Sequence, residues 1–211
     1  MIQAGAMQWM AGDVSATTGI KGAGDFLSKT IRGKVTGESV IKPEYTGDGT
    51  LVLEPTYRHI ILLDLDEWGN SIVLDDGLFL ACESTLKQKA VRRKTFSSAF
   101  AGGEGFFNLG LKGSGVVCIE SDCPREELVE ITLEDDVVKI DGNLAIAWSG
   151  SLDFTVERAG KSLLGSAASG EGLVNVYRGT GKVLLVPVGN QAMKPQQVIE
   201  KEPVIVGDDD E

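Results

Sequence analysis

The amino-acid sequence repeats itself at a nearly constant interval. Gly49, Gly115 and Gly181 close the triplets GDG, GSG and GTG, and consecutive members of this series differ in sequence number by 66. A second block, LDDGLFLACES, recurs as KIDGNLAIAWSGS, and the sequence numbers of its Gly77 and Gly142 differ by 65. Self-similarity at a fixed interval is the signature of a fold built from stacked supersecondary units.

Short apolar runs bounded by turn residues fill each repeat. Glycine accounts for 27 of 211 residues, about 13%, where about 7% is usual. Runs of four to seven β-branched or aromatic residues between such turns are typical of strands. For the second copy they predict strands at 106–112, 116–120, 128–133, 137–140, 144–148 and 153–158. The fold class is therefore predicted to be all-β.

Three local features refine this prediction. The continuous run HIILLDL at 59–65 predicts a buried strand, and EWGN at 67–70 and LEDD at 133–136 predict equivalent hairpin turns. The G-x-G triplets predict tight turns between consecutive strands. The best helix candidate is DFLSKTIRG, with Asp25 as N-cap and Gly33 just beyond its end.

The repeat predicts a single compact domain over residues 1–188. Two repeats span 36–101 and 102–168, and the third combines 169–188 with 1–35. We therefore expect residues 169–188 to pack beside residues 2–13.

That third unit lacks a strand matching 61–66 and 129–134. The tail, residues 189–211, either supplies this strand or is a disordered extension. In the second case the seam is an open sheet edge that another chain fills, which favours self-association.

The order of these motifs resembles a known family. GAMQWM, DGLFLACE, SLDFTVER and SGEGLVNVYRGTGKVLLVP together resemble the family named for altered inheritance of mitochondria, over residues 3–188. The resemblance implies three tandem TRAP-like subdomains, each a short double-stranded β-helix, around a pseudo-threefold axis. Family members usually carry a further strand before the GAM segment, so either this sequence starts late or its tail substitutes. The resemblance implies no catalytic or cofactor residue, and fold alone transfers no function.

The repeated acids and glycines are the first candidates for chemistry. Glu38, Glu104 and Glu171 recur with the repeat and could form a ring of carboxylates around a cation, but turn carboxylates are the favoured interpretation. The G-x-G triplets lack the phosphate-binding patterns G-x-G-x-x-G and G-K-[ST]. The only histidine, His59, stands at a strand start with no G-x-S-x-G motif in the chain.

The remaining candidates are basic, aromatic and thiol side chains. KQKAVRRK at 87–94 is the one basic concentration and is interpreted as a solvated strand edge, with an acidic partner, RNA or a lipid headgroup as the alternative. Trp9 and Trp148 are predicted to pack in the core, and Trp68 to be exposed at a hairpin tip. The cysteines, Cys82, Cys118 and Cys123, are predicted to be reduced, with Cys118 in the core and Cys123 exposed.

Net charge and the length of the apolar segments argue against two classes of function, nucleic-acid binding and membrane spanning. The net charge of −11 makes nucleic acid an unlikely partner, and no segment approaches the ~20 apolar residues of a transmembrane helix. No targeting segment is evident, so a cytoplasmic location is expected. We predict a non-enzymatic assembly or interaction protein that forms homo-oligomers through sheet edges, with no catalytic, cofactor or metal site. The alternative is a binding module that holds a small ligand or nucleic acid between subdomains.

Overall fold

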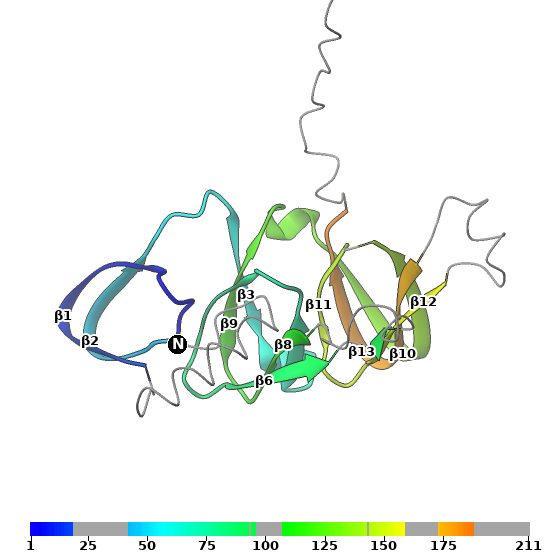
Figure 1. Ribbon diagram of the computed structural model, residues 1–211, viewed down its shortest axis with the longest axis horizontal. Coiled ribbons are helices and arrows are strands. Elements are labelled where there is room, and N and C mark those ends of the chain that lie inside the picture. Colours follow the sequence, from blue (N-terminus) through cyan, green and yellow to red (C-terminus); the bar gives the residue numbers. More distant parts are fainter. Residues whose placement is uncertain (19–41, 93, 96–106, 143, 159–172, 188–211) are drawn as a thin grey trace, which may run out of the picture.

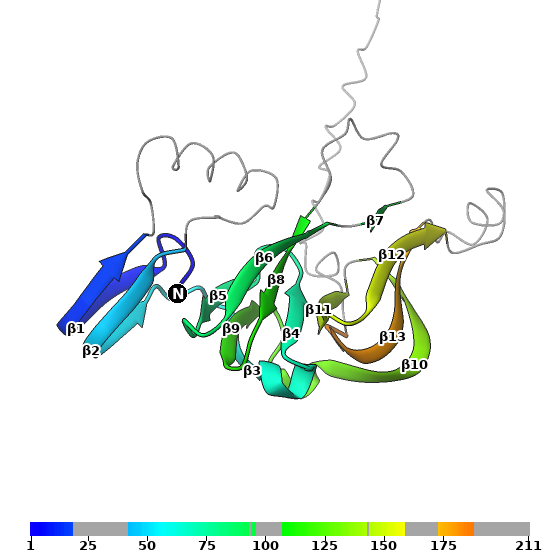
Figure 2. The same ribbon diagram turned by 90° about the horizontal axis from the view of Figure 1, so that it is seen from below.

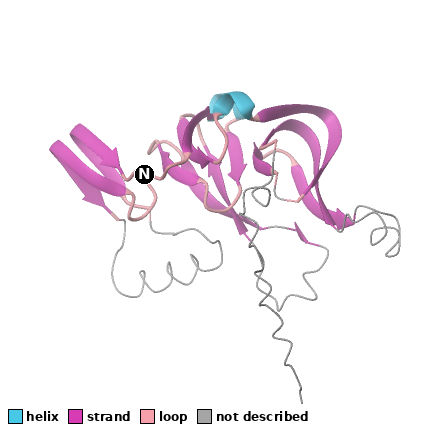
Figure 3. Ribbon diagram, turned by 90° about the horizontal axis from the view of Figure 1, so that it is seen from above, coloured by secondary structure: helices cyan, strands magenta, loops and turns pink. Residues whose placement is uncertain are grey.

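The protein is all-β (Figure 1; Figure 3). The computed structural model describes residues 1–18, 42–92, 94–95, 107–142, 144–158 and 173–187. The strands are β1 (Met7–Thr17), β2 (Glu44–Leu53), β3 (His59–Asp64), β4 (Ser71–Leu74), β5 (Phe79–Cys82), β6 (Lys87–Arg92), β7 (Lys94–Thr95), β8 (Phe107–Lys112), β9 (Val116–Ser121), β10 (Val129–Asp141), β11 (Ala145–Ser149), β12 (Asp153–Arg158) and β13 (Leu173–Leu185). Two 3-10 turns, η1 (Leu65–Trp68) and η2 (Arg125–Glu127), interrupt them.

Strand pairing follows one pattern along the chain. In residues 129–185, hereafter unit 3, β13 lies between β10 on one side and β11 and β12 on the other. In residues 59–121, unit 2, β8 and β9 lie in the same way between β3 and β4 on one side and β5 and β6 on the other. In residues 1–53, unit 1, β2 pairs with β1. Each unit therefore pairs the strand that follows its first glycine turn with the strand that contains or follows its G-x-G triplet.

The register of this pairing is the same in all three units. Met10 faces Leu51, Cys82 faces Val117, and Trp148 faces Val183. Both members of the pair advance by 66 from unit 2 to unit 3, and by 72 and 66 from unit 1 to unit 2. A register shift also recurs at the equivalent places, Met7/Trp9, Phe79/Ala81 and Ala145/Ala147.

Neighbouring units are joined by a strand-to-strand junction. Between units 2 and 3, β4 pairs with β11, so that Leu74 faces Ala147. Between units 1 and 2, Ile2 faces Ala81 in an isolated bridge, and Met1 and Cys82 exchange two backbone hydrogen bonds of 2.7 and 2.8 Å. Ile2 and Leu74 are equivalent. The Ile2 N–H donates to Pro43 O at 3.0 Å, Leu74 faces Leu109, and Pro43 and Leu109 are 66 residues apart. The units lie in a row along the longest axis, with β1 at one end and β10 and β12 at the other (Figures 1 and 2).

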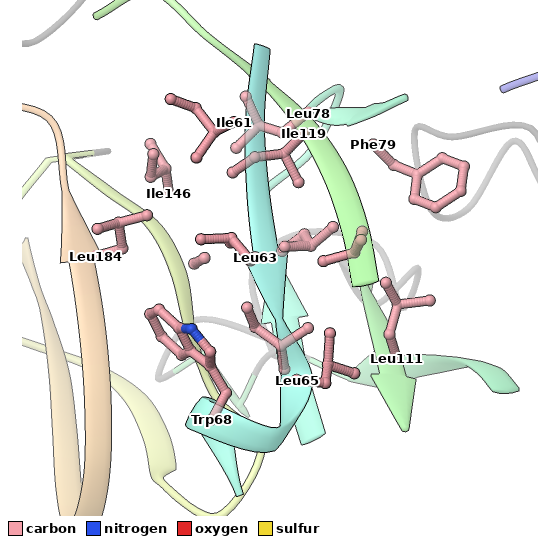
Figure 4. Packing of buried hydrophobic residues seen from close by; sticks show 14 of the residues in the cluster. Ile61, Leu63, Leu65, Trp68, Leu78, Phe79, Leu111, Ile119, Ile146 and Leu184 are labelled. Carbon is pink, nitrogen blue, oxygen red and sulfur yellow. The ribbon is translucent and has the colours of Figure 1, made fainter. Parts of the chain in front are cut away.

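Two buried clusters form the core. The larger fills unit 2 and also takes in Ala147, Ile146 and Leu184 from unit 3. Figure 4 shows Ile146 and Leu184 approaching Leu63 and Trp68 across the junction. The second cluster fills unit 3 around Trp148 and Tyr177, and it includes Val73 from unit 2. The junction between units 2 and 3 is thus continuous with both cores.

In units 1 and 3 the G-x-G triplet bends a strand rather than ending it. β2 and β13 run without interruption through GDG and GTG, whereas GSG does separate β8 from β9. Gly47, Gly113 and Gly179 have φ of 125°, 137° and 116°, in the region that favours glycine. The predicted tight turn is therefore wrong in units 1 and 3, where one strand continues around the bend.

The expected packing of residues 169–188 beside residues 2–13 is wrong for the described part of the chain. β13 pairs with β10, β11 and β12, while β1 pairs with β2. The physical reason is that consecutive antiparallel strands pair at a low entropic cost of loop closure. The domain limit at residue 188 stays a prediction, since residues 188–211 are outside the described range.

Several local predictions have clear outcomes. The strands predicted for the second repeat match β8 to β12 within a few residues, with 128–133 and 137–140 merged into β10. HIILLDL forms β3, but Ile60 and Leu62 are 52% and 68% exposed, so only alternate residues are buried. The EWGN turn is η1 followed by left-handed Gly69 and Asn70, and LEDD is a bulge in β10. The helix candidate at 25–33 lies outside the described residues.

Candidate functional site

The predicted chemical candidates do not converge. Glu38, Glu104 and Glu171 lie outside the described residues. His59 begins β3 and is exposed, as a strand-end histidine would be. Its neighbour Arg58 is engaged with acids, with 3.0 Å from Nε to Asp122 Oδ1 and 3.7 Å from Nη1 to Glu120 Oε2. Among the described residues, no three His, Cys, Asp or Glu side chains gather as a metal site would require.

The basic stretch is a sheet edge. Residues 87–92 form β6, the outermost strand of the large sheet, where it pairs only with β8 in the described structure. Lys87 and Lys89 lie on this strand at every second position, so they share one face. Charged side chains on an outermost strand hinder edge-to-edge pairing, in agreement with the predicted solvated edge.

The three thiols are unpaired and poorly suited to nucleophilic chemistry. None of Cys82, Cys118 and Cys123 forms a disulfide. Desolvation raises the pKa of Cys118 to about 11, with a further contribution from the Glu120 carboxylate, and burial also raises the pKa of Cys82. A reactive thiol needs the opposite shift. Cys123 is buried, so its predicted exposure is wrong; its amide donates to Ser121 Oγ at 3.1 Å.

A small cavity lies between units 2 and 3. Its volume is about 120 Å³, and Val73, Asn108, Trp148, Asp153 and Phe154 contribute to its lining. Sites for cofactors and drug-sized ligands are usually about 300–1,000 Å³. This cavity is therefore too small for such a ligand.

Among the described residues, strand β1 carries three exposed large apolar side chains. Met7, Trp9 and Met10 are 37%, 49% and 45% exposed along β1. Their equivalents in unit 3 are Ala145, Ala147 and Trp148, and all three are buried. The predicted burial is thus correct for Trp148 and wrong for Trp9. The reverse holds for Trp68, which was expected at an exposed tip but is 3% exposed at the end of η1.

The opposite end, at β10, is also open. Val137 is 45% exposed, and the outer edge of β10 at residues 137–140 has no strand beside it in the described structure. The equivalent strand in unit 2, β4, pairs on its outer edge with β11. Sequence reasoning missed this edge; apolar Val137 at a position held by Ser71 in unit 2 is the signal that could have found it.

The fold and these surfaces define an all-β protein whose most prominent open features, among the described residues, are strand edges. Comparison with known proteins then gives the family. The family model described as Mitochondrial biogenesis AIM24 matches residues 1–188. An uncharacterised protein of Streptococcus pyogenes serotype M6 is 30% identical over 191 residues, covering 87% of this chain and 75% of that protein. The chain belongs to the Mitochondrial biogenesis AIM24 family.

A solved structure has a similar fold. A crystal structure of a Streptococcus pyogenes protein superposes with a TM-score of 0.64 at 28% identity, covering 90% of this chain and 84% of that one. In the described part of the present chain, no helix is both long and apolar enough to span a bilayer.

Proposed function

We propose that this chain is a non-enzymatic assembly protein that associates with further copies of itself through the edges of its sheets. The observation that carries the proposal is β1, a strand whose apolar Trp9 and Met10 are about half exposed while the equivalent residues of unit 3 are buried. Exposed apolar strand edges are templates for pairing with another chain. A two-stranded ribbon such as β1 and β2 is also marginally stable without cover.

The recurrence of one pairing register supports three tandem TRAP-like subdomains, which correspond to units 1 to 3. A closed pseudo-threefold arrangement within one chain would need β1 to meet β10. The two strands lie at opposite ends of the row (Figure 1), which favours contacts between copies. A cytoplasmic location and the lack of enzymatic activity stay predictions.

The alternative, a module for a small ligand or nucleic acid, has weaker support. The cavity between units 2 and 3 is small, and the net charge of −11 opposes binding to phosphate backbones. A ligand present at about 100 times its Kd would add about 2.7 kcal/mol to the unfolding free energy. A metabolite panel screened by thermal shift would reveal such a ligand.

Light scattering with size-exclusion chromatography tests the leading proposal. We expect a mass that is a multiple of 22.4 kDa, or one that grows with protein concentration. A strict monomer over the whole accessible concentration range would overturn self-association. A monomer combined with a reproducible thermal shift would favour the binding module instead.

A further inference from the structure

The junction between units is repeated in the same register, and its two halves are both present at the ends of the row. Ile2 faces Ala81 between units 1 and 2, and Leu74 faces Ala147 between units 2 and 3. The two members of the pair advance by 72 and 66 from one junction to the next. Each junction therefore joins the residues just before one unit's first glycine turn (Gly5 or Gly77) to the strand just after the next unit's first glycine turn (Gly77 or Gly142).

Extending this register by one more step identifies a specific pairing. The strand of unit 3 that corresponds to β4 is β10, because Ser71 faces Lys112 as Val137 faces Arg178, and both members of the pair advance by 66. The strand that corresponds to β11 at the other end is β1. Leu74 and Ala147 thus correspond to Ile140 and Trp9, and Val73 and Trp148 correspond to Lys139 and Met10.

We propose that β10 of one copy pairs antiparallel with β1 of the next copy, joining copies head to tail. This inference rests on the proposed function and specifies its interface. Ile140 faces Trp9 of the next copy, Lys139 faces Met10, and Val138 faces Ala11. The partner is a second copy of this chain, because the chain itself carries both complementary halves.

Burial supports the pairing. At the junction between units 2 and 3, Ala147 and Trp148 are 0% and 2% exposed, whereas their equivalents at the open end, Trp9 and Met10, are 49% and 45% exposed. The aliphatic stem of Lys139 can cover Met10 while its ammonium group stays in water. Pairing the two ends places Trp9 and Met10 in the environment that their equivalents already have.

Side-chain volume is also complementary. Between units 2 and 3, Trp68 of η1 and the small Ala147 belong to one buried cluster. In unit 3 the chain passes from Thr132 to Val137 without an η1 turn, so no tryptophan stands there. Trp9 occupies the Ala147 position instead. The large ring is thus supplied by the other side of the interface, which preserves the packed volume.

The backbone can make the pairing on both sides. Gln3 N–H donates to Leu80 O at 2.7 Å, and the equivalent Asp75 N–H donates to Ile146 O at 3.0 Å. The next member of this series is Asp141 N–H to Gln8 O. Likewise Cys82 N–H donates to Met1 O, so the N–H of its equivalent, Met10, points away from β2.

Two proline variants test the interface. Met10→Pro and Lys139→Pro each remove an outward N–H at an edge, where proline is tolerated, and each blocks one half of the proposed junction. Sedimentation velocity on the full chain is expected to show association for the unsubstituted protein and monomers for each variant alone. An equimolar mixture of the two variants is expected to form heterodimers, because the intact β10 edge of Met10→Pro pairs with the intact β1 edge of Lys139→Pro. Assembly stops there, because both remaining edges are blocked by proline.

Each other outcome has a defined meaning. Association of Lys139→Pro alone would indicate a β1-to-β1 contact, and association of Met10→Pro alone would indicate a β10-to-β10 contact. Either result would overturn the head-to-tail pairing. Association that survives in both variants would overturn it while leaving self-association in place. A monomeric unsubstituted chain would overturn both the head-to-tail pairing and self-association. That result would also be obtained if β1 and β10 paired within one chain.

A cross-linking pair keeps the test valid if a proline variant fails to fold. Ala11→Cys in one copy and Val138→Cys in another are expected to form an intermolecular disulfide on mild oxidation, since opposed residues of antiparallel strands are close enough. Ala11→Cys with Val137→Cys is the matched control, because a shift of one residue places the thiols on opposite faces. Equal cross-linking of both pairs, or cross-linking of neither, would overturn the proposed register.

Discussion

Units 1 and 3 share a strand register but differ sharply in burial. In unit 3, Trp148 is 2% exposed and its ring lies 5.2 Å from Phe154 and 5.3 Å from Tyr177, centroid to centroid. In unit 1, Met10 occupies the same position and is 45% exposed. The pairing within each ribbon is the same, so the difference arises from what lies beside it.

The neighbour of β11 is β4, whereas β1 has no such neighbour in the described residues. The pairing of strands within a unit is thus set by local sequence and backbone hydrogen bonds. The burial of the paired side chains depends on a strand of the adjacent unit. Units 2 and 3 each take part of their core from the other, as in repeat proteins whose stability resides partly in the interfaces between repeats.

The largest expected effect contrasts the two tryptophans. Trp148→Ala removes a buried ring from the unit 3 cluster and is expected to lower the free energy of unfolding by about 3–5 kcal/mol. Trp9→Ala is expected to change it by no more than about 0.5 kcal/mol when measured below the concentration of association. Urea denaturation followed by circular dichroism gives both values. A large loss for Trp9→Ala in a monomer would mean that β1 is covered within its own chain.

A second contrast concerns the bend glycines Gly47 and Gly179, which are equivalent in units 1 and 3. An alanine Cβ at Gly47 would overlap the backbone oxygen of Asp13 in β1, whereas at Gly179 the nearest atom is Leu152 Cδ2 at 3.8 Å. Gly179→Ala therefore carries mainly the cost of positive φ, about 1–2 kcal/mol. Gly47→Ala carries that strain and must also separate β1 from β2.

Hydrogen exchange distinguishes these two variants. Gly47→Ala is expected to speed amide exchange throughout β1 and β2, and Gly179→Ala to leave the protection pattern of β13 in place with a lower thermal midpoint. Equal protection of β1 and β2 in both variants would show that unit 1 accommodates the methyl group by a local shift.

The sequence predicts the strands well, because each is a short apolar run bounded by glycine or acidic turns. β8, β9 and β12 begin and end within a residue of the expected places. The boundaries between the repeated units are not predicted by the sequence. A periodic sequence shows that units recur but not where one begins, so 169–188 could be assigned equally to the preceding strands or to the N-terminus.

Burial was harder to predict for the same reason. HIILLDL is apolar at consecutive positions, but Ile60 and Leu62 face a side of β3 on which no other unit of the described structure packs. The predicted burial of Trp9 and the predicted exposure of Trp68 are both wrong. The turn sequence EWGN does not reveal that η1 packs Trp68 into the unit 2 cluster. The candidate interface therefore depends on tertiary neighbours, and only the exposed Met7, Trp9 and Met10 on one strand carry a local signal.

The smallest effect concerns Cys118, which holds in unit 2 the position of Leu184 in unit 3. Leu184 is fully buried at the junction, whereas Cys118 is half-buried on the outer face of β9. The pKa of Cys118 is raised from 9.0 to about 11, so at pH 8 its thiolate fraction is about 100-fold below that of an unperturbed thiol. Alkylation by iodoacetamide is expected to be slower than in the urea-unfolded chain by roughly that factor, with Cys118→Ser identifying the signal by mass spectrometry.

The same shift gives a sign to the pH dependence. Between pH 9 and about 11 the unfolded thiol loses its proton while the native thiol keeps it, so the native state binds more protons and the free energy of unfolding falls as pH rises. Cys118→Ser is expected to flatten that decline. If assembly covers this face as unit 2 covers Leu184, alkylation should slow further as concentration rises; a rate that is independent of concentration would place Cys118 outside the interface, as head-to-tail pairing of β10 with β1 requires.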